Sequence, residues 1–88
     1  LHLTRISARE LGPDVRVNAI VPGAVLPPAS IAPDSARWQA MGESVPLRRT
    51  GHPRYVAQTA IFLAQNDYIT GAIIPVDGGE HLIGIGTH

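Results

Sequence analysis

The side chains that most often carry metal or covalent chemistry are scarce in this 88-residue sequence. There is no Cys, which excludes disulfides, thiol nucleophiles and Cys-ligated zinc, and there is no Lys, because all seven cationic residues are Arg. The four histidines, at positions 2, 52, 81 and 88, show no spacing typical of metal ligands. We therefore expect no metal site, and the candidate site lies where the backbone itself is unusual.

The unusual backbone is the stretch RVNAIVPGAVLPP, residues 16–28. An apolar run of strand character passes directly into Pro22-Gly23, and a second, shorter apolar run ends at Pro27-Pro28. Pro donates no ladder hydrogen bond and Gly lets other atoms approach the main chain, so the strand stops abruptly at a turn without bulk. Taken alone, the Pro-Gly dipeptide is most often a strand-ending turn, and a binding role needs further motifs around it.

The residues before this turn predict a helix and a strand. Residues 1–11 have helical spacing, and Gly12-Pro13 is expected to end the helix as a C-cap glycine followed by proline. Residues 15–21 are nearly continuously apolar after Arg16, a pattern typical of a strand that is buried on both faces in a parallel sheet.

The residues after the turn predict a short helix and then a longer one. Asp34 or Ser35 is expected to cap a helix that runs through Met41 and is ended by Gly42. A connecting loop, 45–51, leads to the longer helix. Its first residue is Pro53, it runs to about Gln65, and its apolar stripe consists of Val56, Ala60 and Leu63.

A second strand is predicted over residues 72–76, ending at Asp77-Gly78-Gly79, where Asp77 is expected to form a turn. The two strands and the helical connection form one βαβ unit with parallel strands. A single unit of this kind cannot cover two apolar strands, and the sequence starts without Met inside a helix. We therefore expect neighbouring strands to be missing and the chain to be a fragment of a larger α/β domain.

Composition and charge exclude several classes of partner. The 44% hydrophobic content is typical of a globular protein, and seven cationic residues balance seven anionic ones. The longest run of like charge is Arg48-Arg49, which argues against nucleic acid or an anionic membrane as the main partner. Prolines interrupt every apolar run, so no membrane span is expected, and the first residues are unlike a signal peptide. These features predict a cytoplasmic protein.

Three segments in order resemble the carboxyl-terminal third of short-chain dehydrogenases/reductases: LTRISARELGPDVRVNAIVPGAV, PLRRTGHPRYVAQTAIFLA and ITGAIIPVDGG. The resemblance covers roughly residues 3–82, and the ending DGGEHL is most similar to pteridine-reductase-like members. It implies that residues 1–88 are the carboxyl-terminal βαβ part of a single Rossmann-like, doubly wound parallel sheet, with 29–50 as a variable substrate-lid segment.

The resemblance also implies a cofactor-binding role for Pro22, Gly23, Ala24 and Val25, because the family places the nicotinamide of NAD(P)(H) against the corresponding loop. By position, Val25 would bind the carboxamide through its own N–H and C=O, and Gly23 would let the main chain pass close to the flat ring. Pro27 stands where the family often has a Thr that contacts the cofactor. The grip of this loop is therefore expected to be weaker or differently arranged.

Three apolar side chains are candidates for the implied substrate lid: Leu26, Trp38 and Met41. For Trp38 and Met41, three residues apart on the short helix, the alternative is that they only pack a small satellite cluster. Asn18 is expected to satisfy nearby backbone groups rather than to touch a ligand.

Two functions follow from the resemblance. In the first, the chain supplies the nicotinamide-side loop, the substrate lid and the oligomer surface of an NAD(P)(H)-dependent oxidoreductase, pteridine- or dihydrofolate-type reductases among the candidates. That enzyme would act on a small molecule and assemble as a homo-oligomer. The family's glycine-rich loop and Tyr-x-x-x-Lys motif have no counterpart in the sequence, so the chain alone is predicted to be inactive and to bind the cofactor weakly. The alternative is a catalytically inert remnant that acts only through self-association.

Overall fold

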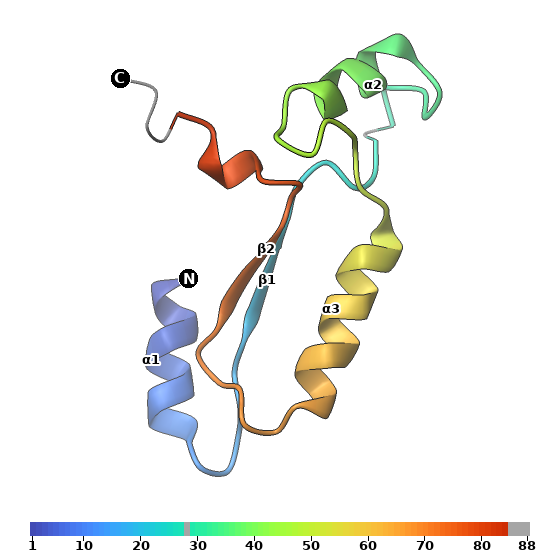
Figure 1. The fold of residues 1–88 in the computed structure, drawn as a ribbon. Coiled ribbons are helices and arrows are strands. Elements are labelled where there is room, and N and C mark those ends of the chain that lie inside the picture. The colour runs from blue at the N-terminus through green and yellow to red at the C-terminus, as the bar shows by residue number, and fades with distance from the viewer. Residues whose placement is uncertain (28, 85–88) are drawn as a thin grey trace.

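The computed structural model describes residues 1–27 and 29–84, and this part of the chain is an α/β arrangement (Figure 1). In chain order its elements are α1 (His2–Leu11), β1 (Ala19–Pro22), α2 (Ala36–Glu43), α3 (Pro53–Gln65), β2 (Ile73–Val76) and the 3₁₀ helix η1 (Glu80–Leu82). The two strands pair in parallel, with Ala19 opposite Ile73 and Pro22 opposite Val76. The predicted βαβ unit is therefore confirmed.

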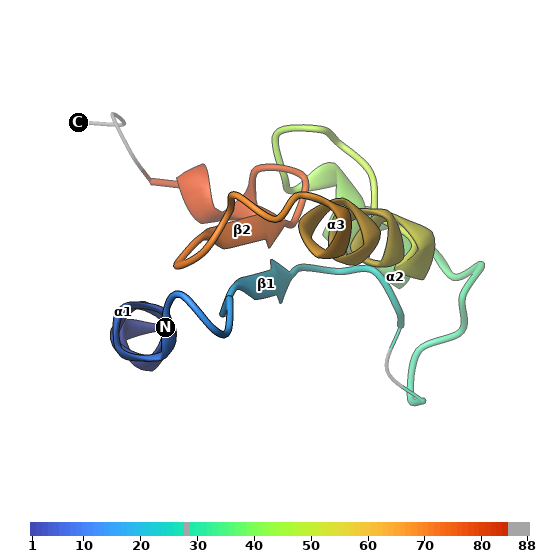
Figure 2. The ribbon, with the colours of Figure 1, turned by 90° about the horizontal axis from the view of Figure 1, so that it is seen from below.

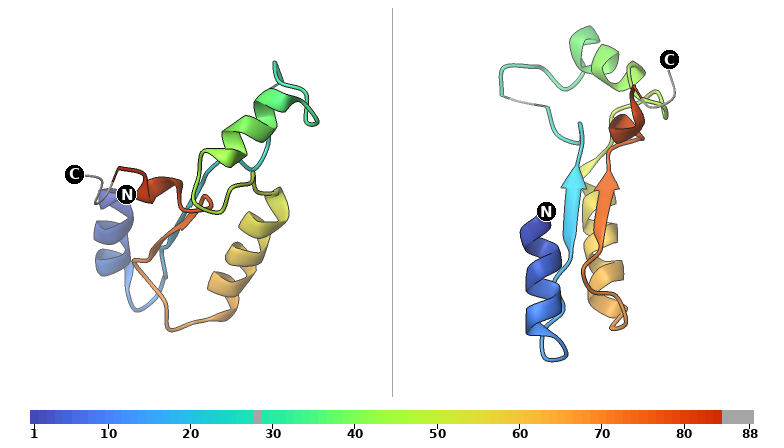
Figure 3. Two further views of the ribbon diagram at one scale, coloured as in Figure 1. Left: turned by 45° about the horizontal axis from the view of Figure 1, so that its top comes forward. Right: turned by 90° about the vertical axis from the view of Figure 1, so that its left-hand side faces the viewer.

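The helices lie around this pair of strands in a way that leaves their carboxyl ends accessible. Seen along the strands, α1 and α3 flank the pair on opposite sides (Figure 2). The α2 helix and η1 both lie beyond the carboxyl ends of the strands, so that the loops leading to them meet there (Figure 3). This is the end at which open α/β sheets bind their ligands.

The first strand is shorter than predicted, because β1 begins at Ala19 rather than at residue 15. The backbone of Val17 is engaged elsewhere: its N–H donates to the hydroxyl of Thr70 (3.1 Å), and its C=O accepts from the N–H of Gly71 (2.8 Å). Regular pairing with β2 starts only where these contacts to the loop before β2 end. The second strand differs less, beginning one residue later than predicted.

The helix predictions are confirmed where a local capping signal defines them. The α3 helix spans the predicted residues, with Pro53 in its first turn and the ring Nδ1 of His52 accepting from the N–H of Arg54 (3.1 Å). The α2 helix is capped by Ser35, whose hydroxyl accepts from the N–H of Trp38 (3.1 Å). Of the predicted stripe on α3, Leu63 is buried but Ala60 is exposed.

Of the two glycines predicted to end helices, one does so. Gly12 is the C-cap of α1, which ends at Leu11 as predicted, although its conformation is extended (φ −69°, ψ 151°) rather than left-handed. Gly42 lies inside α2, which continues to Glu43. It is buried there because the loop at Arg49 and Thr50 crosses so closely that a Cβ at Gly42 would collide with the loop backbone. Gly42 therefore allows the backbone of α2 and the backbone of the loop at Arg49 and Thr50 to lie in close contact.

The described part of the chain is open and has a small core. The buried hydrophobic residues are Ala8, Trp38, Val45 and Leu63. The radius of gyration is 15.7 Å, whereas a compact domain of this length has a value of about 12 Å. Much of the apolar surface of both strands and both flanking helices therefore remains available for contact with further structure.

Candidate functional site

The site is built where the two parallel strands end side by side. The N–H of Gly23, the first residue after β1, donates to the carbonyl of Val76, the last residue of β2 (3.0 Å). The loop then bends: the N–H of Val25 donates to the carbonyl of Gly23 (3.0 Å), and the carbonyl of Ala24 accepts from the N–H of Gly51 (2.8 Å). The loop is thus fixed on one side by β2 and on the other by the segment before α3.

These bonds bear on the predicted role of Val25. Its N–H is used within the bend, so in this arrangement it does not offer the donor that a nicotinamide carboxamide would accept. The binding role of Val25 stays a prediction, and its side chain supplies the more direct contact with the site, because it lies against Gly51 at the wall of a cavity.

Gly23 is held tightly against the turn that follows β2. A Cβ at Gly23 would lie 2.6 Å from the Cβ and 2.8 Å from the Cα of Asp77, distances that no side chain can occupy. The sequence analysis attributed this glycine to the approach of a flat ring, and the structure supplies a reason from within the chain. Gly23 is needed so that the ends of β1 and β2 can turn past one another.

Asp77 forms the predicted turn. Its carboxylate accepts from the N–H of Gly79 (3.0 Å) and of His81 (3.1 Å), and the Nδ1 of the His81 ring lies 3.0 Å from both of its oxygens. The Asp77 side chain is only 8% exposed. Burial raises the pKa of the Asp77 carboxyl, but hydrogen bonds from the His81 ring and from the two N–H groups together lower the pKa below its ordinary 3.8.

A cavity of about 560 Å³ lies between this turn, α2, and the amino-terminal half of α3. Its walls are mainly apolar, and its titratable side chains are those of Arg49, Tyr55, Asp77 and His81. The apolar part of the lining includes Ala24, Val25, Met41, Val45, Leu47, Ile74, Val76 and Leu82.

Only some of the predicted site residues line this cavity. Ala24, Val25 and Met41 line it, whereas Pro22 and Gly23 are not part of the lining. Leu26 is 71% exposed and does not line the cavity. Trp38 is also outside the lining; it is 7% exposed and packs as a buried side chain of α2, which favours the satellite-cluster alternative for this residue.

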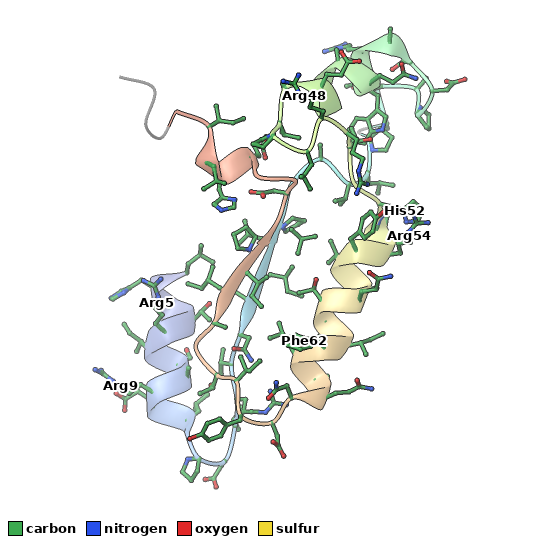
Figure 4. All side chains as sticks on the ribbon, viewed as in Figure 1. Arg5, Arg9, Arg48, His52, Arg54 and Phe62 are labelled. Atoms are coloured by element: carbon green, nitrogen blue, oxygen red, sulfur yellow. The ribbon has the colours of Figure 1, made fainter. Side chains whose placement is uncertain are left out.

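A cluster of Arg49, Arg54 and Tyr55 at the edge of the cavity was missed by the sequence analysis. Both guanidinium groups donate to the Tyr55 hydroxyl at 3.3 Å. Figure 4 shows Arg54 beside His52 at the amino-terminal end of α3, and Arg48 on the preceding loop. The one available signal was the density of arginine around a single tyrosine in RRTGHPRY.

Arg16 was also missed, and it lies at the opposite end of the strands. Its guanidinium donates to the carbonyls that end α3 and begin the next loop, with distances from 2.8 to 3.2 Å. Asn18 was predicted to satisfy backbone groups and does so, bonding the carbonyl of Ile69 (3.1 Å) and the N–H of Ala72 (2.9 Å). Its partners are distant in sequence rather than local.

Neither a membrane span nor a metal site is found within residues 1–27 and 29–84. None of the helices there has the length and apolar character needed to cross a membrane. No three His, Asp or Glu side chains of the same residues gather in a way that would hold a metal ion.

Comparison with known proteins identifies relatives over nearly the whole chain. The sequence model of the family described as enoyl-(acyl carrier protein) reductase matches residues 1–81. A 3-oxoacyl-(acyl-carrier-protein) reductase of Thermotoga maritima is 42% identical over 83 residues, which are 90% of this chain and 33% of the relative. A 3alpha-hydroxysteroid dehydrogenase of Mediterraneibacter gnavus is 43% identical over 86 residues, covering 86% of this chain and 32% of the relative.

Solved structures also resemble this chain over most of its length. The alternative dihydrofolate reductase FolM of Brucella canis, complexed with NADP, has a TM-score of 0.81 and 36% identity over 92% of this chain and 32% of its own. A small-chain dehydrogenase in complex with NADPH has a TM-score of 0.74 and 34% identity over 89% of this chain and 37% of its own. This chain therefore spans about a third of the length of the relatives that it matches.

Proposed function

The chain belongs to the short-chain dehydrogenase/reductase family, and from that premise we propose that it forms the carboxyl-terminal part of an NAD(P)(H)-dependent oxidoreductase. In this role it supplies the loop beside the nicotinamide, a lid over the substrate and a surface for assembly. The rest of the nucleotide-binding sheet would lie along the free edge of β1. The open shape of the chain and its relatives' greater length both support this proposal.

One observation carries the proposal: loop 22–25 lies at the carboxyl edge of a parallel strand pair, where open α/β sheets bind ligands. Ala24 and Val25 present a smooth apolar wall there, which fits the nicotinamide end of a dinucleotide. No lysine or glycine-rich loop at a helix start is present in the sequence to hold the pyrophosphate. The cofactor would supply the hydride, while this loop would orient the ring that carries it.

For the substrate, we propose a small molecule with a reducible C=O or C=N bond, of the pteridine or dihydrofolate type. The fold likeness to FolM, with TM-scores of 0.80 and 0.81, supports this class. Met41 on α2 lines the cavity from the lid side and would contact the substrate. The remainder of segment 29–50 would close over it.

A second candidate is an inert remnant that associates with copies of itself. It is favoured by the many large apolar side chains that the described residues leave exposed, among them Ile61 and Phe62 on α3. The unpaired edge of β1 adds backbone groups that another strand could bond. In this case the 88-residue chain would form concentration-dependent oligomers and would bind neither NADH nor NADPH.

A chimera separates the two candidates. In it, this chain replaces the matching third of Brucella canis FolM, and NADPH binding and NADPH-dependent dihydrofolate reduction are measured. The proposal expects a folded chimera that binds NADPH and turns over, whereas the chain alone shows no turnover. A folded chimera without NADPH binding contradicts the oxidoreductase proposal.

A matched pair of variants locates the contact within that chimera. Val25→Asp places a negative charge in the cavity wall and should weaken NADPH binding at least about tenfold, since the carboxylate is desolvated against an apolar ring. Gln58→Asp adds the same charge to the exposed surface of α3 and should change binding less than about twofold. Equal losses of NADPH affinity in both variants would show that loop 22–25 does not contact the cofactor.

A further inference from the structure

Two guanidinium groups converge on a single phenol at the edge of the cavity. Arg49, from the loop after α2, and Arg54, from the first turn of α3, each donate to the Tyr55 hydroxyl at 3.3 Å. Both also lie over the ring of Tyr55, at 5.5 and 5.1 Å from its centroid. Tyr55 thus acts as a platform that holds two positive charges side by side.

These charges have no carboxylate partner within the described residues. The ion pairs found there join Arg9 to Glu10 and His81 to Asp77, and no acidic oxygen comes within 4.0 Å of Arg49 or Arg54. Glu43 shares a shallow depression with Arg49 but makes no ion pair with it. Two like charges held this close repel one another, and an external anion between them would relieve the repulsion.

The charged pair adjoins an apolar space. Arg49 and Tyr55 line the cavity of about 560 Å³, and behind them the walls are formed by side chains such as Val45, Ile74 and Leu82. A ligand bound here would have its apolar part against these walls and its polar end at the arginines. The combination selects for molecules that have both parts.

We propose that Arg49 and Arg54 bind the anionic head group, a carboxylate or a phosphate monoester, of an amphiphilic ligand whose apolar part occupies the cavity. This binding does not depend on hydride transfer, although Ala24 and Val25 of the proposed nicotinamide loop line the same cavity. The experiment measures ligand binding and not turnover, so its result does not depend on the oxidoreductase proposal.

Tyr55 provides an internal reporter for the site. Hydrogen bonds from Arg54 and Arg49, together with their charges, lower the pKa of the Tyr55 hydroxyl below its ordinary 10.0. An anion that binds the same guanidiniums competes with the tyrosinate and must therefore raise that pKa. The other charged or titratable groups around it are Arg48, His52, Glu43 and the Asp77–His81 pair.

The experiment is a titration of tyrosinate absorbance in the 88-residue chain carrying Tyr68→Phe. Tyr68 is 97% exposed, so its removal leaves Tyr55 as the one tyrosine without disturbing the fold. The probes are octanoate, octyl phosphate, acetate and octanol at matched ionic strength. Octanoate or octyl phosphate should raise the pKa of Tyr55, and the tighter of the two identifies the head group.

The two single-part probes and the arginine variants decide the outcome. Acetate and octanol should bind at least about tenfold more weakly than the amphiphile, and Arg54→Gln or Arg49→Gln should weaken amphiphile binding about tenfold, the loss expected of one charge-assisted hydrogen bond. Arg5→Gln removes the same charge from the outer side of α1, where Arg5 points away from the strands (Figure 4), and should have no effect. Binding of octanol equal to that of octanoate, or an equal effect of Arg5→Gln, would overturn the proposal.

Discussion

The two ends of the strand pair are built in contrasting ways. At the amino end, side chains that reach across the structure satisfy backbone groups: Arg16 bonds four carbonyls around the end of α3, and Asn18 bonds both a carbonyl and an N–H of the loop before β2. Both side chains are thus engaged with the backbone of distant segments, and neither lines the cavity.

At the carboxyl end, close backbone contact takes the place of such side-chain bonds. Gly23 lies against Asp77, Gly51 against the Val25 side chain, and Gly79 against Pro46, each at a distance that excludes a Cβ. The cavity opens beside these contacts, and its titratable groups face it. The amino end is therefore held by side-chain hydrogen bonds, whereas the carboxyl end is held by close backbone contacts beside a cavity that charged side chains line.

The strongest test of this contrast is Arg16→Leu. The substitution removes the guanidinium that donates to several partly buried carbonyls. We therefore expect the free energy of unfolding to fall by about 3 kcal/mol or more. The measurement is urea denaturation followed by far-UV circular dichroism. Arg9→Leu is the control, because Arg9 makes only an exposed surface pair with Glu10. Similar losses from both variants would mean that the amino end is not held by Arg16.

At the other end, Gly23→Ala tests whether close contact is the organising device. The added Cβ would meet Asp77 at 2.6 Å, and we expect a loss of about 1–3 kcal/mol as the two turns are forced apart. Gly12→Ala is its matched control. There the nearest atom to a new Cβ is the carbonyl oxygen of Ala8 at 3.4 Å and φ is −69°, so stability should change by less than about 1 kcal/mol. If Gly23→Ala leaves the free energy of unfolding unchanged, the ends of the two strands have room to separate.

A third prediction uses pH, because Asp77 at the carboxyl end titrates and the side chains that hold the amino end do not carry a carboxylate. The pKa of Asp77 is lower in the folded chain than its ordinary 3.8. Its carboxylate therefore stabilises the turn above that pH, and this contribution is lost as pH falls further through the folded pKa. The protection of the Gly79 and His81 amides against hydrogen exchange, measured relative to an unfolded chain at the same pH, should then fall. The protection of the Ala72 amide should not change. The same dependence in Asp77→Asn would assign the effect to another group.

The smallest expected effect concerns strain beside the cavity. Arg48 has a left-handed conformation (φ 59°), which costs a residue with a side chain about 1 kcal/mol. Arg48→Gly should therefore raise the free energy of unfolding by a few tenths to about 1 kcal/mol, measured by urea denaturation. Arg48→Ala removes the same charge but keeps the unfavourable φ, so it should not stabilise. A gain of equal size in both variants would point to charge repulsion at this loop instead.

Local signals in the sequence determined a large part of the architecture. The limits of α3 follow from Pro53 and Asn66 at its ends, and the cap of α2 follows from Ser35, because a capping bond spans only a few residues. The parallel pair follows from two apolar runs separated by helices, and Asp77 was recognised as a turn residue from its place before two glycines.

Tertiary structure alone decided the features that depend on segments far apart in the chain. Residues 15–18 look like strand, yet Val17, Arg16 and Asn18 bond partners about 50 residues away, so β1 starts later. Gly42 looks like a helix end but is a crossing point for the loop at Thr50. The pairing of Arg49 and Arg54 on Tyr55, and the burial of Trp38 while Met41 faces the cavity, likewise arise from how α2, α3 and their loop meet. Sequence patterns report which residues prefer a helix, strand or turn, whereas contacts of this kind are set by the distance between elements after they have folded together.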